Sequence, residues 1–246
     1  MKNKSAIFYA LRFAIIAALA CAIIIFLGFF VAGRMDDNAN SKDALATDDT
    51  LVTFVLDAGH GGEDAGAVAS DGTLEKDLNL KITKMLASLL ELNGCNVRLT
   101  RDEDTLLYDY YGDLDDYTGQ KKIYDLKNRL KIAEERENSI YVGIHMNNFS
   151  SSKYSGLQVY YSKNNSVSYE IANFIRSSNR LYLQKDNSRE IKGATSSIYI
   201  LDKITIPAVL VECGFLSNSN ELALLKSEDY QKKMSIMLFY SCIQFK

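Results

Sequence analysis

The chain has 246 residues, of which 47% are hydrophobic and 24% charged, an ordinary composition for a protein with one buried core. The formal net charge is −3, but residues 1–34 contain basic and no acidic residues, so the rest of the chain is clearly acidic. An acidic domain lacks the basic surface that binds nucleic acid, which excludes a nucleic-acid partner. The four cysteines form no CxxC pair, which favours buried free thiols over a disulfide framework or a cysteine zinc site.

The N-terminal segment, residues 1–34, is predicted to be a membrane anchor or a signal segment. Residues 13–33 form an uncharged run that is long enough to cross a bilayer as a helix. Basic residues precede this run, so the positive-inside rule places the N-terminus in the cytoplasm and the main domain outside. We therefore expect a single-pass protein of the cytoplasmic membrane with an extracytoplasmic domain. Cleavage after Val31-Ala32-Gly33 is the alternative and would make the protein secreted.

Residues 51–246 are predicted to form one domain that follows a polar tether at residues 35–50. Apolar runs rich in β-branched residues indicate strands, and apolar residues at helical spacing indicate helices. The predicted order is strand 51–56, helix 77–92, strand 96–100, loop 101–120, helix 123–137, strands 139–145 and 157–161, helix 167–183, strands 198–201 and 208–211, and helices 220–226 and 229–243. Such alternation predicts an α/β fold with a mostly parallel or mixed central sheet of about six strands and helices on both faces.

The chain contains two histidines, and each follows or ends a predicted strand. His60 lies in a Gly-His-Gly-Gly turn after the first strand, and His145 ends the third. Active sites in α/β sheets gather at strand ends, and imidazole is the commonest zinc ligand. The pair therefore predicts a metal site, because two histidines at two strand ends are less readily explained by structural roles than one.

A catalytic zinc ion requires a third protein ligand, which the residue types alone do not single out. Glu75 lies fifteen residues after His60, just before the first helix, where it could instead compensate the helix dipole. The remaining acidic candidates for this position are Asp57, Asp64, Asp71 and Asp77.

Glu212 follows the apolar run Ile206–Val211 and is the candidate for a catalytic base. A carboxylate at the end of a buried strand is costly unless it is paired, protonated or functional. A metal-dependent hydrolase requires a base beside the attacking water. A helix N-cap or a buried salt bridge is the structural alternative.

Four segments in order resemble the motifs of the zinc-dependent N-acetylmuramoyl-L-alanine amidases, the type 3 amidase family. These segments are Leu56-Asp57-Ala58-Gly59-His60-Gly61-Gly62, Gly72-Thr73-Leu74-Glu75-Lys76, Ile144-His145-Met146-Asn147 and Val211-Glu212-Cys213-Gly214-Phe215. The resemblance runs from about Thr53 to the C-terminus. It implies that His60, Glu75 and His145 bind Zn²⁺ and that Glu212 is the catalytic carboxylate. Thr100, Arg101 and Arg129 also match family positions, without an assigned chemical role.

The resemblance further implies hydrolysis of the amide bond between N-acetylmuramic acid and L-alanine, with peptidoglycan as substrate. A compact domain behind one N-terminal anchor is similar to the sporulation and germination branch, whose members help to make the muramic-lactam of the spore cortex. A vegetative amidase, another zinc peptidase of the cell wall and a catalytically silent wall-binding module are the alternatives. Some amidases of this type require a partner, so a protein activator is a further expectation.

Overall fold

The computed structural model describes residues 51–246, which belong to a compact unit beginning at Asp49. The predicted anchor at residues 1–34 and the tether at 35–50 lie outside the described residues. Among residues 51–246, no helix combines the length and the apolar character that a membrane crossing requires.

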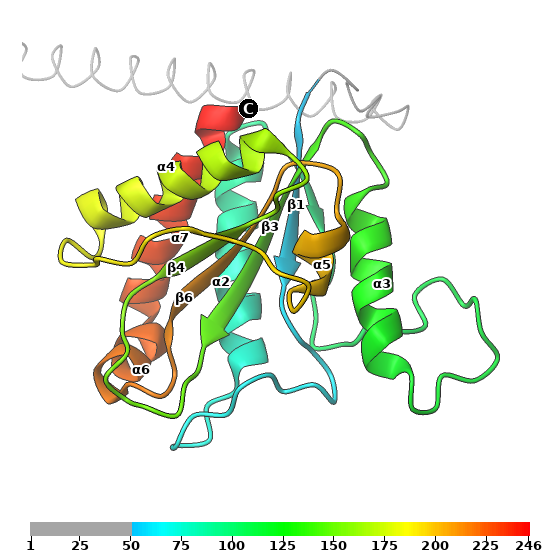
Figure 1. The fold of residues 1–246 in the computed structure, drawn as a ribbon, viewed down its shortest axis with the longest axis horizontal. Helices are drawn as coiled ribbons and strands as arrows, with labels where there is room; N and C mark the ends of the chain where they lie inside the picture. Colours follow the sequence, from blue (N-terminus) through cyan, green and yellow to red (C-terminus); the bar gives the residue numbers. More distant parts are fainter. Residues whose placement is uncertain (1–50) are drawn as a thin grey trace, which may run out of the picture. The chain divides into compact units, whose positions relative to one another are not determined.

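A six-stranded mixed sheet with the order β2-β1-β3-β6-β4-β5 forms the centre of the domain (Figure 1). In chain order, its strands β1 to β6 are Thr53–Ala58, Asn96–Leu99, Ser139–Asn147, Gln158–Tyr161, Lys192–Gly193 and Ala208–Phe215. Strands β2, β1, β3 and β6 run parallel, whereas β4 is antiparallel to β6 and parallel to β5. The predicted α/β class with a mixed sheet of about six strands is confirmed.

Helices cover both faces of the sheet, as the alternation of elements predicts (Figure 1). The helices α2 to α7 are Glu75–Leu92, Lys121–Ala133, Ser166–Tyr182, Tyr199–Lys203, Ser219–Lys226 and Glu228–Cys242, and a 3-10 turn follows at Ile243–Phe245. Buried side chains of α2, α4, α6 and α7 share one apolar core with one face of the central strands. Side chains of α3 and α5 form a smaller core on the opposite face.

The alternation of side chains along β3 decides on which face of the sheet His145 lies. Val142 and Ile144 belong to the larger core, whereas Tyr141 belongs to the smaller core beside α3 and α5. Successive side chains of a strand point to opposite faces, so His145 shares the face of Tyr141. The carboxyl ends of β1, β3 and β6 lie at one edge of the sheet, because these strands are parallel.

The prediction of a strand at 198–201 was wrong, because this run belongs to α5, Tyr199–Lys203. A short apolar run fits a buried strand and a buried helical turn equally well, and here Ile200, Leu201 and Ile204 all pack into the smaller core. The edge strand β5, only two residues long, was not predicted. The loop at 101–120 contains no helix or strand, as expected.

Three cysteines of the described domain, Cys95, Cys213 and Cys242, are free and buried. Burial raises the pKa of each thiol, so all three remain protonated and unreactive near neutral pH. The prediction of buried free thiols is confirmed for these residues.

Candidate active site

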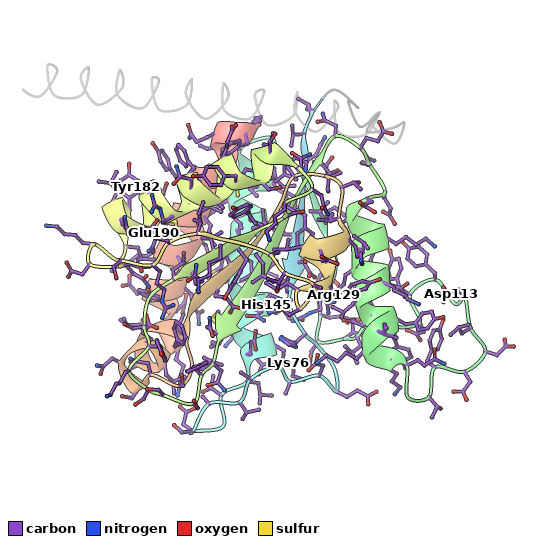
Figure 2. The ribbon with its side chains drawn as sticks, viewed as in Figure 1. Lys76, Asp113, Arg129, His145, Tyr182 and Glu190 are labelled. Atoms are coloured by element: carbon purple, nitrogen blue, oxygen red, sulfur yellow. The ribbon has the colours of Figure 1, made fainter. Side chains whose placement is uncertain are left out.

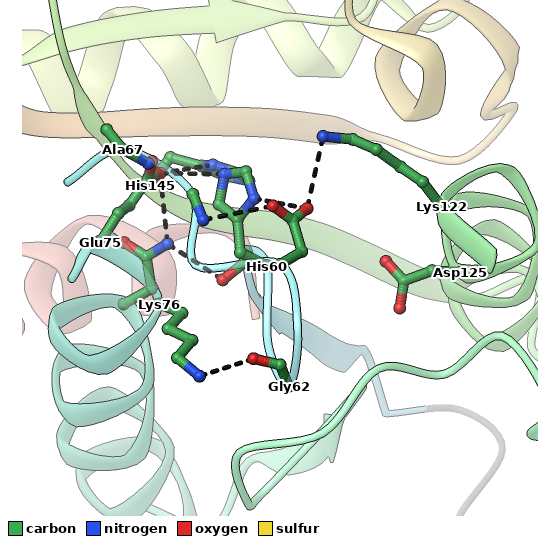
Figure 3. Close-up of polar contacts among 12 residues, drawn as sticks. His60, Gly62, Ala67, Glu75, Lys76, Lys122, Asp125 and His145 are labelled. Carbon is green, nitrogen blue, oxygen red and sulfur yellow. Dashed lines mark hydrogen bonds and ion pairs between the residues drawn. The ribbon is translucent and has the colours of Figure 1, made fainter. Parts of the chain in front are cut away.

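His60, Glu75 and His145 come from three distant parts of the chain and meet at the carboxyl ends of β1 and β3 (Figure 3). One ligand atom of each side chain lies within 4.8 Å of the others. His60 belongs to the loop after β1, Glu75 is the first residue of α2, and His145 lies near the end of β3. Two imidazoles and a carboxylate at this separation can hold a divalent metal ion.

Glu75 lies between the two imidazole rings and is 4% exposed. Its Oε1 is 3.0 Å from Nδ1 of His145 and 3.3 Å from Nε2 of His60. The backbone N–H of Met146 donates to Oε1, and that of Ala67 donates to Oε2. Burial alone raises the pKa of Glu75, but the hydrogen bonds and charges of the two histidines hold it far below its usual range. Glu75 is therefore an anion in spite of its burial.

The ring of His60 is oriented by Asp64, one of the acidic residues that competed with Glu75 as a ligand. Oδ2 of Asp64 is 2.9 Å from Nδ1 of His60, which leaves Nε2 directed toward Glu75. Burial lowers the pKa of His60, yet the hydrogen bonds and charges of Glu75 and Asp64 raise it overall. Carboxylates that accept from the second nitrogen of a metal-binding histidine fix its tautomer and orientation.

The other three acidic candidates lie elsewhere. Asp57 pairs with Arg129 inside the domain, and Asp71 pairs with Lys226 at the surface. Asp77 is exposed on the first turn of α2. Among the candidates left open by residue chemistry, the fold therefore brings only Glu75 into contact with both histidines.

Two glycines make room for the close approach of these side chains. A Cβ atom on Gly59 would lie 2.2 Å from the imidazole of His145. A Cβ atom on Gly66 would lie 2.6 Å from Oε2 of Glu75, and the φ of 67° at this residue also favours glycine. Any larger residue at either position would displace one of the three side chains.

Two buried arginines hold the loop that carries His60, a role for which the sequence offered no argument. Nη1 of Arg129 contacts Asp57 and the carbonyl oxygen of Ala58, and Nη2 donates to the carbonyl oxygen of His60 at 2.7 Å. Arg101 donates through Nε to the carbonyl oxygen of Ala58 at 2.8 Å. His60 itself has a φ of 63°, an uncommon value outside glycine, which these contacts help to hold. Arg101 directly follows the predicted strand 96–100, whereas Arg129 lies within a predicted helix, so only Arg101 occupied a position that could have drawn attention to it.

Glu212 lies on β6 directly opposite His145 of β3 and Gln158 of β4. Side chains of residues paired in this way point to the same face, so Glu212 faces the histidine site. Its Oε2 is buried without a hydrogen-bond partner among residues 51–246, and its carboxylate forms no ion pair there. The position inside a strand also rules out a helix N-cap.

Burial raises the pKa of Glu212 to about 7. The charges of His145 and His60 lower it only in part, and the charge of Glu75 raises it further. A carboxyl group with a pKa near neutrality can accept and return a proton under physiological conditions, as a general base must. The arrangement thus combines a donor set that can hold a divalent metal ion with a carboxyl group that can transfer a proton.

Comparison with known proteins agrees with this geometry. The chain matches the N-acetylmuramoyl-L-alanine amidase family over residues 54–239. The germination-specific N-acetylmuramoyl-L-alanine amidase of Bacillus subtilis (strain 168) is 33% identical over 190 residues, which cover 77% of this chain and 78% of that protein.

Two solved amidase structures share the fold over nearly their whole length. The CwlD amidase from Clostridioides difficile, in complex with the GerS lipoprotein, has a TM-score of 0.72 and 41% identity, covering 79% of this chain and 98% of that one. The catalytic domain of CwlV from Bacillus (Paenibacillus) polymyxa has a TM-score of 0.64 and 30% identity, covering 79% and 98%. The chain therefore belongs to the N-acetylmuramoyl-L-alanine amidase family and is a hydrolase of that kind.

Proposed function

We propose that this chain hydrolyses the amide bond between N-acetylmuramic acid and L-alanine of peptidoglycan, with Zn²⁺ held by His60, Glu75 and His145. The observation that carries the proposal is the convergence of this donor set with an unpaired carboxylate, Glu212, on one face of the sheet. Two histidines and one carboxylate form a donor set of catalytic zinc sites, which keep a position open for water or substrate.

The chemistry that zinc supplies when bound is polarisation of a carbonyl oxygen and acidification of water. Glu212 then accepts the proton of the water that attacks the lactyl carbonyl carbon. The same carboxyl group returns this proton to the nitrogen of L-alanine as the carbon–nitrogen bond breaks. The products are a lactyl carboxylate on the sugar and a peptide with a free N-terminal L-alanine.

A test of this function uses the full chain, purified in mild detergent, stripped of metal with a chelator and incubated with peptidoglycan. Mass spectrometry identifies the products before and after zinc is restored. We expect zinc-dependent release of peptides that begin with L-alanine, and loss of this release in His145→Ala. The surface variant Lys226→Gln serves as the control with an intact donor set. Cleavage between peptide residues, or binding without cleavage by the zinc-loaded protein together with the partner proposed below, would contradict the proposal.

We also propose that the enzyme acts on the spore cortex and works with a protein partner. Similarity to a germination-specific amidase supports the first part. Similarity to an amidase solved in complex with a lipoprotein supports the second. Deletion of the gene should remove muramic-lactam from cortex digests, and affinity purification from sporulating cells should recover a partner. Unchanged cortex composition together with altered vegetative walls would place the enzyme in vegetative growth instead.

Residues 13–33 are proposed to anchor the enzyme in the cytoplasmic membrane, with the catalytic domain outside. The support is the uncharged run and the basic residues before it. Membrane fractionation with external protease distinguishes the possibilities. A retained anchor predicts a membrane-bound chain whose domain is digested in protoplasts, whereas cleavage predicts a shortened chain in the medium.

A further inference from the structure

A groove of about 850 Å³ lies beside the catalytic face and takes no part in the chemistry above. Its walls are the loop after β3 at residues 153–156, the segment at residues 183–190 after α4, and parts of α6 and α7. Gln158 of β4 also lines it, and Gln158 is the strand partner of Glu212. The groove therefore begins one strand away from the proposed base.

Arg189 is held in this groove above an aromatic surface. Its Nε donates to the carbonyl oxygen of Ser155 at 2.6 Å. The guanidinium carbon is 4.5 Å from the ring centroid of Phe215 and 5.8 Å from that of Tyr154. Its neighbour Glu190 marks this segment in Figure 2, on the side of the sheet beyond β4. A guanidinium stacked in this way is preorganised, so less conformational entropy is lost when it binds a ligand.

An irregularity in β6 brings this arginine toward the catalytic face. His145 pairs with Glu212, whereas Asn147 pairs with Phe215, so β6 contains one extra residue over this stretch. Such a bulge changes the alternation of side chains. Phe215 consequently shares the face of Glu212, although it lies three positions further along the chain, and Arg189 lies over that ring.

Arg189 forms no ion pair within the described domain, residues 51–246. Glu221 lies near enough for its pKa to respond to Arg189, but its two oxygens accept the backbone N–H groups of Gly156 and Phe215. Glu190 pairs with two arginines of α4. The Nη atoms of Arg189 are thus available to an anion from outside.

We propose that Arg189 is a specificity-determining residue that binds a free carboxylate of the stem peptide, on the residue that follows L-alanine. This inference rests on the proposed amidase function. Phe215 lies three positions from Glu212 along a strand that rises about 3.3 Å per residue, and two extended residues of a stem peptide span about 7 Å, so this carboxylate comes within reach of the guanidinium over that ring. Arginine pairs with carboxylates through two parallel hydrogen bonds, which gives geometric selectivity as well as affinity.

Two defined muropeptides test the inference, identical except that the residue after L-alanine carries either a free α-carboxylate or an α-carboxamide. The zinc-loaded full chain should cleave the acid with a kcat/KM at least about tenfold higher, chiefly through KM, since a hydrogen bond to a charged group contributes roughly this factor or more. Arg189→Gln should lose the preference by slowing cleavage of the acid alone. Lys185→Gln, an exposed cation of the same groove, should keep it. Equal cleavage of both substrates by the wild type, or an unchanged preference in Arg189→Gln, would overturn the inference.

A binding measurement distinguishes a failure of this inference from a failure of the proposed function. Calorimetry with the inactive Glu212→Gln chain measures the affinity for both muropeptides without turnover. Tighter binding of the acid by that chain, lost when Arg189→Gln is added, would support carboxylate recognition even if the wild type cleaved neither compound. Equal affinity for the two compounds would refute carboxylate recognition whatever the outcome for catalysis. If Arg189→Gln does not fold, Arg189→Lys serves in its place, with a reduced preference expected because lysine lacks the planar fork.

Discussion

Replacement of Glu212 by glutamine should strongly slow catalysis while leaving metal binding intact. Glutamine has nearly the same shape, and the carboxylate it replaces makes no ion pair among residues 51–246. A positioned general base contributes a factor of about 10² to 10⁴. We therefore expect kcat/KM to fall by that factor, which corresponds to roughly 3 to 5 kcal/mol in the barrier. The zinc content should remain that of the wild type, because the donor set is untouched.

The same substitution should stabilise the metal-free protein above neutral pH. Burial raises the pKa of Glu212 from its usual 4.5 to about 7. The unfolded chain therefore releases this proton near pH 4.5 and the folded chain near pH 7. Between these values the wild type progressively loses stability, up to roughly 3 kcal/mol, and above pH 7 the loss is constant. Glutamine does not titrate, so the variant should equal the wild type near pH 4 and exceed it at pH 8.

Urea unfolding in the presence of a chelator, at pH 4 and pH 8, measures the stability difference, and muropeptide release with zinc measures catalysis. Glu221→Gln is the matched control. Burial also raises the pKa of Glu221, but its carboxylate accepts two backbone hydrogen bonds. That control should lose stability at pH 8 without a hundredfold loss of kcat. Wild-type activity in Glu212→Gln would refute the assignment of the base, and equal stability at pH 8 would refute the argument from burial.

Three further variants test the support of the site. Asp64→Ala should weaken zinc affinity by about 10- to 100-fold in a chelator competition, because it removes the acceptor that orients a metal-binding histidine; unchanged affinity would contradict this role. Gly66→Ala should abolish metal binding in calorimetry, whereas Gly72→Ala should not: both residues have a positive φ, but only at Gly66 would a Cβ atom meet Glu75. Equal losses in the two variants would show that backbone strain alone is responsible. Arg129→Met should lower the free energy of unfolding by about 3–5 kcal/mol in urea titrations, because it leaves two buried carboxylates without their cationic partner; a change below about 1 kcal/mol would refute this estimate.

Most helices and strands were predicted correctly from the sequence because their apolar residues follow the period of the element. The predicted helix 167–183, for example, corresponds to α4, Ser166–Tyr182. Prediction failed where the segment was short. The run at 198–201 is a helical turn, and the two-residue strand β5 has too few residues to show any period. In both cases contacts with the rest of the fold, rather than local preference, determine the structure.

The sequence by itself determined the α/β class, the position of His60 and His145 at or near strand ends, and a carboxylate directly after an apolar run, although β6 continues past Glu212 to Phe215. It did not, without the family resemblance, distinguish Glu75 from four nearby aspartates, and it assigned no role to Arg101 or Arg129. Only the tertiary structure decided which carboxylate contacts both histidines and which backbone atoms the two arginines bind. Metal binding and ion pairing depend on distances between residues that are remote in the chain, and those distances are set by strand register and helix packing, which residue types and spacing do not contain.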